Sequence, residues 1–212
     1  LAPKDAIIMA VVCNFLGALV MTLFNAQVAE TISNMVSFDS QGNASQVALA
    51  AALFSIVFWA VAAWYFGIPT SESHALIAGL TGSALALGGL EAVNPNEWAK
   101  VILGLIISTV FGFGSGYLIT KLVAQIFQYT SRKKANRLFN SGQGLAAAAM
   151  AFLHGVQDGQ KFMGVFMLAL FYNGLAQQTA TGNFIIPLWV MIVCSLIMGF
   201  GTSVGGMRII KS

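Results

Sequence analysis

The chain has 212 residues, of which 58% are hydrophobic and only 8% are charged, and ten Lys or Arg against seven Asp or Glu give a formal net charge of +3. Because an average soluble domain is about half apolar and about a quarter charged, this composition excludes an ordinary soluble enzyme, a nucleic-acid-binding protein and a disordered chain. It indicates a membrane protein with several transmembrane segments. The two cysteines, Cys13 and Cys194, lie far apart in apolar runs, which is typical of small buried side chains rather than of a disulfide.

Uncharged runs of about 20 residues mark the predicted spans, since a helix of this length crosses a bilayer. The runs are too long and too evenly apolar for the strands of a barrel, so the expected fold is an all-α polytopic membrane protein. In chain order, the spans are predicted over residues 6–29, 47–66, 99–122, 143–171 and 185–207.

Segment 67–90 differs in composition from the spans on either side. It opens with the run Gly67-Ile68-Pro69-Thr70-Ser71, carries Glu72 and His74, and is rich in Gly and Ser further on. This pattern indicates a helix broken at membrane depth, or a hairpin of two half-helices.

The basic residues of the chain gather in one connection, 123–140, which follows Lys121 and holds the run from Arg132 to Arg137. The positive-inside rule places this connection in the cytoplasm. Residue 1 then lies on the same side only if segment 67–90 makes a net crossing. A basic run beside membrane spans is typical of an orientation signal that also contacts lipid headgroups, and a regulatory or nucleic-acid-binding patch is the less favoured alternative.

The hydroxyl-rich start of segment 67–90 is the first group of residues that could carry chemistry. Ser and Thr cap helices well, and a helix that begins here would point free N–H groups and its positive dipole end at one spot. The hydroxyls of Thr70, Ser71 and Ser73 can donate to an oxyanion. Glu72, as a carboxylate, would repel one, so it must face a cation, be protonated or point to water. A capped helix without a ligand is the alternative.

The second group, residues 154–161, interrupts an otherwise apolar span. At 100° per residue, a sector of about 100° on one helix holds His154, Gln157, Asp158 and Lys161. Ionisable residues inside a span are costly, and they usually line a pathway or pair with another charge. An Asp158–Lys161 pair that only neutralises itself is the alternative, but it leaves the additional His and Gln unexplained.

Other signals are weaker. Glycines within the predicted spans, such as Gly112, Gly114 and Gly116, favour close packing between helices. The sequence contains no P-loop, no GxSxG motif and no His/Cys cluster with zinc spacing. We therefore expect neither an enzyme nor an ATP-driven pump.

The two polar groups and their neighbours resemble motifs of the PiT family of inorganic phosphate transporters. The family segment Gly-x-Pro-x-Ser-x-x-His-x-x-x-Gly corresponds to residues 67–79, and the segment His-Gly-x-Asn-Asp-x-x-Lys-x-x-Gly corresponds to residues 154–164. Their order, the basic linker between them and the stretch 14–18 also agree, so the resemblance covers nearly the whole chain. Glu72 stands where a hydroxyl residue is usual, and Gln157 stands where Asn is usual.

The resemblance implies an inverted-repeat secondary transporter with broken helices and a helical hairpin. Residues 1–122 would hold first-repeat helices with the hairpin at 67–90, residues 123–140 a basic cytoplasmic linker, and residues 141–212 the start of the second repeat. The family's first Asn-Asp helix and second Ser/Thr hairpin are not in this sequence, so we expect a partial chain with about half of the site. Analogy with the family also implies a homodimer in the cell membrane.

The resemblance further implies a cation-coupled inorganic phosphate symporter that is driven by sodium or protons and works by alternating access. The alternatives are a transporter of sulfate or another tetrahedral oxyanion, a passive channel and a non-transporting membrane scaffold. Residues expected to bind phosphate are Thr70, Ser71, Ser73 and Gln157. Residues expected to bind the coupling cation are Asp158, as the Na⁺ ligand, and Glu72. Residues expected to support the site are His74, His154, Gln160 and Lys161.

Overall fold

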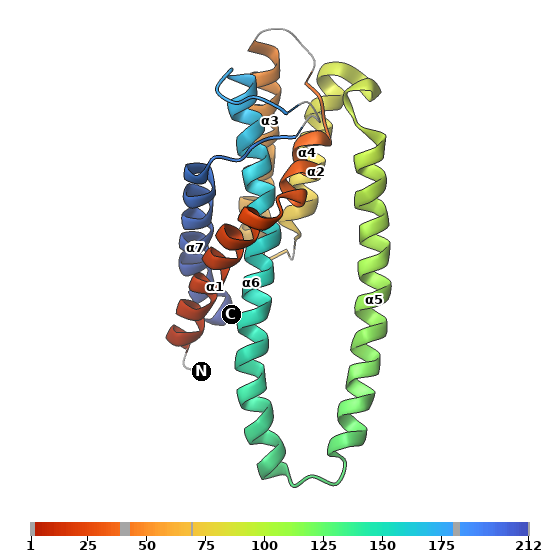
Figure 1. Cartoon of the computed structure of the whole chain (residues 1–212), viewed down its shortest axis with the longest axis vertical. Helices are drawn as coiled ribbons and strands as arrows, with labels where there is room; N and C mark the ends of the chain where they lie inside the picture. The colour runs from red at the N-terminus through yellow and green to blue at the C-terminus, as the bar shows by residue number, and fades with distance from the viewer. Residues whose placement is uncertain (1–2, 39–42, 69, 180–182, 212) are drawn as a thin grey trace.

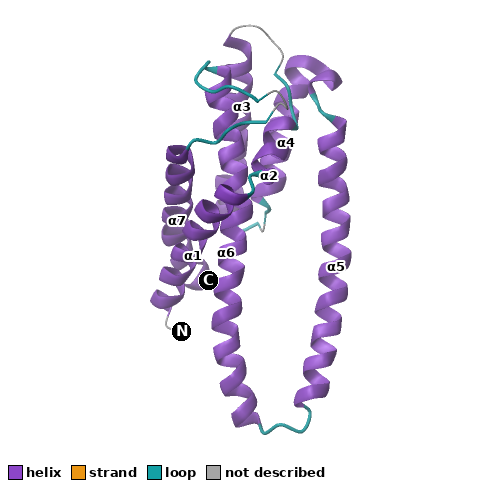
Figure 2. Ribbon diagram, viewed as in Figure 1, coloured by secondary structure: helices purple, strands orange, loops and turns teal. Residues whose placement is uncertain are grey.

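The structure of the chain is a computed structural model (Figure 1), and it describes residues 3–38, 43–68, 70–179 and 183–211, with side chains described up to residue 204. Within these ranges the regular structure is helical, apart from two isolated bridges, Val36–Val93 and Gln178–Phe184 (Figure 2). The predicted all-α fold is confirmed. In chain order the helices are α1 (Pro3–Phe24), α2 (Gln27–Asn34), α3 (Asn43–Phe66), α4 (Glu72–Gly88), the 3-10 helix η1 (Gly89–Ala92), α5 (Pro95–Phe127), α6 (Arg132–Tyr172) and α7 (Leu188–Lys211).

Four helical segments are long and apolar enough to cross a membrane, namely α1, α3, α4 with η1, and α5. The apolar part of α7, Leu188–Val204, is shorter. Helix α6 is less apolar because the polar residues from His154 to Lys161 interrupt it. These helices support the prediction of a multi-pass membrane protein.

Helix α6 forms the centre of the bundle and packs against α1, α2 and α7 (Figure 1). Glycines allow the backbones to approach closely. A Cβ atom added to Gly155 would lie 2.1 Å from the backbone oxygen of Asn14, and one added to Gly17 would lie 2.1 Å from that of Phe152. Small residues on both helices thus permit the α1–α6 contact, as expected in a membrane, where packing rather than apolar burial drives helix association.

The predicted span 6–29 is not one helix. Helix α1 ends at Phe24 and α2 begins at Gln27, and the side chain of Asn25 accepts a hydrogen bond from the backbone N–H of Gln27 at 2.8 Å. A side chain that bonds to its own backbone competes with helical hydrogen bonding. A polar residue inside the apolar run therefore divides it.

Segment 67–90 is neither a broken helix nor a hairpin of two half-helices, because α4 is continuous from Glu72 to Gly88. The hairpin consists instead of α3 and α4, which pack along each other. Its turn begins at Gly67, whose φ of 68° favours glycine. Gly79 does not break α4 but brings it against α3, where an added Cβ would lie 2.7 Å from Ile56 Cγ1. Pro69 lies outside the described residues.

The basic connection 123–140 is also shorter than predicted. Helix α5 continues to Phe127 and α6 begins at Arg132, so the turn covers only residues 128–131. The predicted span 143–171 is the middle and end of a longer helix. The basic residues lie in the first turns of α6, because residues 123–140 contain neither Gly nor Pro and are compatible with helix.

The N-terminus of α1 and the α5–α6 turn lie toward the same end of the molecule (Figure 1). Helix α3 descends from the opposite end to about the middle, and α4 returns toward it. The α3–α4 pair thus begins and ends toward the same end of the molecule, and α5 runs from there to the opposite end. The start of α1 and the basic turn therefore lie toward the same end without the net crossing by segment 67–90 that the sequence analysis required. The cytoplasmic position of this end remains a prediction.

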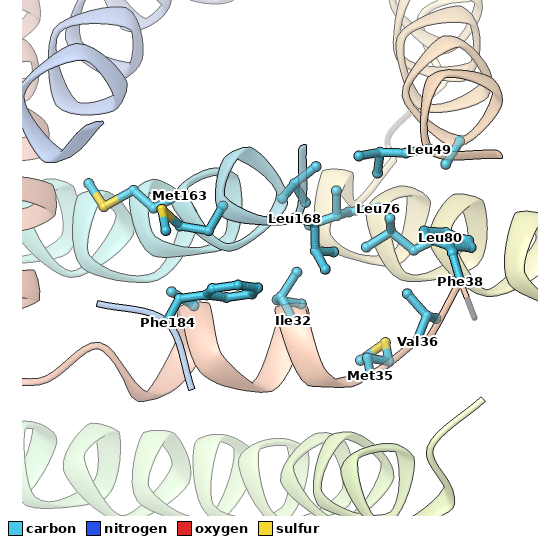
Figure 3. Close-up of a cluster of buried hydrophobic side chains, with 14 of the residues drawn as sticks. Ile32, Met35, Val36, Phe38, Leu49, Leu76, Leu80, Met163, Leu168 and Phe184 are labelled. Atoms are coloured by element: carbon cyan, nitrogen blue, oxygen red, sulfur yellow. The ribbon is translucent and has the colours of Figure 1, made fainter. Parts of the chain in front are cut away.

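A core of buried apolar side chains joins α2, the segment that follows it, α3, α4 and α6 (Figure 3). Leu76 and Leu80 of α4 meet Leu168 of α6 in this cluster, with exposed fractions of 3%, 0% and 2%. The cluster holds the hairpin against the centre of the bundle. It therefore determines which polar residues of α4 and α6 meet.

Helix α5 stands apart from the other helices (Figure 1). Among the described residues of α5, the buried one is Glu97, which lies in the first turn of the helix. A Cβ atom added to Gly112, Gly114 or Gly116 would have no atom within 4 Å in the described part of the chain. The close packing predicted for these glycines is therefore not found among the described residues.

Candidate functional site

The candidate site lies where the first turn of α4 meets the middle of α6. Lys161 Nζ lies 2.8 Å from Asp158 Oδ1 and donates a hydrogen bond to Ser73 Oγ at 2.5 Å. The side chains of Asp158 and Lys161 are each only 17% exposed. His154 Nδ1 lies 3.0 Å from the second carboxylate oxygen, Asp158 Oδ2. Both carboxylate oxygens of Asp158 thus face nitrogen donors.

A small cavity of about 10 Å³ adjoins the Asp158–Lys161 pair. This volume holds about one water molecule, so a tetrahedral oxyanion would fit only after Lys161 or α4 moves. The residues that line the cavity are Glu72, Ser73, Leu76, Asp158, Lys161 and Phe162. The fold therefore brings together four residues of the two predicted groups: Glu72 and Ser73 with Asp158 and Lys161.

Three other residues of the first group face a different side of α4. Thr70, Ser71 and His74 line a separate groove of about 490 Å³ between α3 and α4. Thr70 Oγ1 accepts a hydrogen bond from Trp59 Nε1 at 2.8 Å, and Ser71 caps α4 by accepting from the backbone N–H of His74 at 3.4 Å. The predicted hydroxyl cluster is thus divided between two hollows.

Two glutamines of the second group differ in position. Gln157 is exposed on α6, whereas Gln160 is only 2% exposed. Gln160 Nε2 donates to the backbone oxygen of Asn25 at 2.7 Å, and its Oε1 accepts from the backbone N–H of Val28 at 3.3 Å. Gln160 therefore satisfies backbone groups where α1 ends and α2 begins, rather than lining the cavity beside Asp158.

Asn14 is a buried polar residue that the sequence analysis did not single out as a site residue. It is 2% exposed, and its Nδ2 donates to Thr202 Oγ1 of α7 at 3.0 Å, while its Oδ1 is buried with no hydrogen-bond partner among the described residues. The signal in the sequence that could have identified this residue is a single Asn within an apolar run. Its backbone faces Gly155, next to His154.

The electrostatics of the site combine opposite preferences. Lys161 and the N-terminal turn of α4 favour an anion, whereas Asp158 and Glu72 favour a cation. Among the described residues no group of three or more His, Cys, Asp or Glu could hold a metal ion. A cation at Asp158 would therefore need hydroxyl, amide or backbone oxygens besides the carboxylate, and it would have to displace Lys161 from Oδ1.

Comparisons with known proteins identify the family. The chain matches the phosphate transporter family over residues 1–137 and 126–212. A probable low-affinity inorganic phosphate transporter of Bacillus subtilis is 37% identical over 212 residues, which cover 100% of this chain and 61% of that protein. The low-affinity inorganic phosphate transporter PitB of Escherichia coli is 31% identical over 195 residues, which cover 79% of this chain and 38% of that protein.

A solved structure described as the sodium-dependent phosphate transporter has the same fold. Its TM-score is 0.77 at 18% sequence identity, and the match covers 100% of this chain and 68% of that one. The chain spans about three-fifths or less of the length of these two curated relatives, which are described as transporters and not as enzymes. The match over the full length of the sequence shows that this chain belongs to the phosphate transporter family.

Proposed function

We propose that the full-length protein is a cation-coupled inorganic phosphate symporter, and that this chain contributes about half of its site. Family membership and the similarity to inorganic phosphate transporters support phosphate as the substrate. The observation that carries the proposal is the ammonium of Lys161, which contacts both Asp158 of α6 and Ser73 of α4. A cation, a carboxylate and a hydroxyl meet there within otherwise apolar helices.

Phosphate, as an anion, would be bound by the positive side of this site. Lys161, the hydroxyl of Ser73 and the N-terminal turn of α4 donate to an oxyanion. Gln157 on α6 and Thr70 and Ser71 at the turn of the hairpin are further donors, and they would join the site when the remaining segments of the protein complete it. Of these hydroxyl residues, Ser73 has the most direct support as a phosphate ligand, because it contacts Lys161.

Coupling would follow from competition for Asp158. Without a coupling cation, Lys161 neutralises Asp158 and is held away from an anion. When sodium or a proton binds to Asp158, the carboxylate no longer retains Lys161, which then attracts phosphate. Glu72, in the same cavity, is the second acidic group at which a coupling cation could bind. This gives a physical reason for symport, since each ligand stabilises the state that binds the other.

Alternating access would proceed by movement of one repeat against the other, as in other inverted-repeat transporters. The α3–α4 hairpin is the element that would move against α6, because the cavity between α4 and α6 is too small for phosphate. We also propose that the basic end of α6 faces the cytoplasm, which the charge distribution supports. A homodimer in the cell membrane and contacts of the basic end with lipid headgroups are further expectations.

The test is uptake of radiolabelled phosphate into proteoliposomes that contain the full-length protein. A sodium gradient and a proton gradient are imposed separately, with sulfate as a competitor. We expect accumulation above equilibrium under one gradient and little competition by sulfate. Uptake that only equilibrates would indicate a channel, and strong inhibition by sulfate would indicate a broader oxyanion transporter.

The variant Asp158→Asn tests the mechanism within this assay. We expect it to reduce gradient-driven uptake to background, because Asn binds neither sodium nor a proton as Asp158 does. Glu91→Gln, which removes an exposed acid far from α6 along the chain, is the matched control. Gradient-driven uptake by the monodisperse Asp158→Asn protein at the rate of the control would contradict the proposed role of Asp158.

A further inference from the structure

A second carboxylate, outside the site described above, is buried without full compensation. Glu97 lies in the first turn of α5 and is 9% exposed. Its Oε1 lies 2.6 Å from Lys100 Nζ, while its Oε2 is buried and has no hydrogen-bond partner among the described residues. A buried carboxylate oxygen without a partner loses its hydration without a replacement.

Helix capping does not account for Glu97. In a capping box, a Glu at the third helical position accepts a hydrogen bond from the backbone N–H of the N-cap residue. The N-cap of α5 is Asn94, and its backbone N–H donates instead to the oxygen of Met35 at 3.0 Å. The unpartnered oxygen of Glu97 therefore needs another explanation.

Glu97 borders two polar cavities. One, of about 560 Å³, lies between the end of α2, the start of α5 and the end of α6. The other, of about 150 Å³, also contains Glu30, Gln27 and Lys100. Asn34 borders both cavities as well and donates through its Nδ2 to Asn183 Oδ1 at 3.1 Å. Asn34 thus supplies a second hard oxygen, its Oδ1, to a residue set that lines the same two cavities as Glu97.

The charges around these cavities favour a monovalent cation. Glu97 and Glu30 contribute two negative charges and Lys100 one positive charge, which leaves a single net negative charge. An anion would be repelled, and a divalent ion such as Ca²⁺ takes six to eight oxygen ligands with several carboxylates. Carboxylate, amide and hydroxyl oxygens are the ligands that alkali cations prefer.

We propose that Glu97 and Asn34 form a binding site for a hard monovalent cation at the end of the molecule opposite the α5–α6 turn. Leu168, Phe171 and Tyr172 of α6 line the larger cavity. Ten residues of helix separate Leu168 from Asp158, which is about 15 Å along the axis. The site is thus distinct from the one at Asp158. The proposal of this cation site does not depend on the identity of the transported anion.

The test is equilibrium binding of ²²Na⁺ to the purified full-length protein in detergent, with choline chloride used to keep the ionic strength constant. We expect Glu97→Gln to lower the sodium affinity of one class of sites at least about tenfold, because the anionic ligand is lost. Glu91→Gln removes an exposed acid at the same end and should bind sodium as the wild type does. Asp158→Asn should retain the class that depends on Glu97.

A second variant keeps the proposal testable if Glu97→Gln does not fold. Lys100→Met removes the ammonium from Oε1. Because the Lys100 side chain is 64% exposed, the substitution changes few packing contacts. We expect it to raise the sodium affinity about fivefold, since a partly exposed ion pair contributes about 1 kcal/mol. Unchanged sodium binding in both variants would overturn the site. Displacement of ²²Na⁺ by micromolar Ca²⁺ or Mg²⁺ would overturn its assignment to a monovalent ion.

These outcomes are separable from failure of the proposed phosphate symport. A protein that accumulates no phosphate but loses sodium binding on Glu97→Gln supports this site and contradicts the transport proposal. A protein that accumulates phosphate but binds sodium equally well after Glu97→Gln supports the transport proposal and contradicts this site.

Discussion

Helices α5 and α6 are the two longest in the described chain, and they differ in what surrounds them. Helix α5 has 33 residues and buries only Glu97 near its start. Helix α6 has 41 residues, and eight residues between Gly155 and Leu168 are buried, on the side that faces its neighbours. Both contain glycines, but a Cβ atom added to Gly155 or Gly164 of α6 would meet the backbone of α1 or α2. A Cβ atom added to Gly112, Gly114 or Gly116 of α5 would have no atom of the described chain within 4 Å.

The difference shows that an apolar helix with glycines does not by itself select a partner. In a membrane, lipid tails are as apolar as leucine, so apolar surface alone gives little preference for another helix. Helix α6 is held because its small residues face small residues of α1 and because its polar side chains bond to other helices. Helix α5 has neither kind of contact along most of its length.

The largest expected effect comes from filling the gap between α1 and α6. In Gly155→Ala, the new Cβ would overlap the backbone oxygen of Asn14, and we expect a loss of about 3 kcal/mol of stability. Gly112→Ala on α5 is the matched control and should not destabilise the protein. Thermal unfolding of the purified full-length protein in detergent measures both. Equal unfolding temperatures would mean that the close α1–α6 contact is absent.

A smaller effect is expected from the buried hydrogen bonds of α6. Gln160→Leu leaves the backbone groups of Asn25 and Val28 without their partner, which should cost about 2 to 3 kcal/mol. Gln157→Leu, three residues away on the exposed side, should leave the unfolding temperature unchanged and lower phosphate uptake instead. If both variants lowered only uptake, Gln160 would belong to the transport site rather than to the α1–α2 junction.

The smallest effect is expected where α6 meets α4. Ser73→Ala removes the hydroxyl that accepts from Lys161, and we expect a loss of about 1 to 2 kcal/mol. Ser115→Ala on α5 removes a hydroxyl that, among the described residues, bonds within its own helix to the oxygen of Gly112, and it should be nearly neutral. Unfolding temperatures of the two variants test this comparison, and a greater loss for Ser115→Ala would reverse it.

Much of the fold follows from patterns that the sequence displays directly. Uncharged runs predict most of the helices, and the division between the predicted spans 143–171 and 185–207 agrees with the end of α6 at Tyr172 and the start of α7 at Leu188. The errors have local causes. Asn25 ends α1 inside an uncharged run, and Gly67 rather than the later glycines makes the turn of the hairpin. Residues 123–140 are charged but compatible with helix, so their charge suggested a longer connection than the structure has.

The candidate site was predictable as two groups of residues but not as one geometry. Asp158 and Lys161 are three residues apart on a helix, so their contact follows from the sequence. The contact of Lys161 with Ser73, 88 residues away, does not. The separation of Gln160 from Gln157, and of Ser71 from Ser73, depends on which side of each helix faces a neighbour.

The sequence by itself determined that the chain crosses the membrane as helices, because apolar runs of about 20 residues satisfy their backbone hydrogen bonds in lipid as helices and are too long for barrel strands. It also determined where the costly polar residues lie. Only the tertiary structure decided which of them meet, and that Glu97 and Asn34 border the same cavity. The physical reason is that helix formation depends on local hydrogen bonds, whereas contacts between helices depend on the shapes of surfaces that are distant in the sequence.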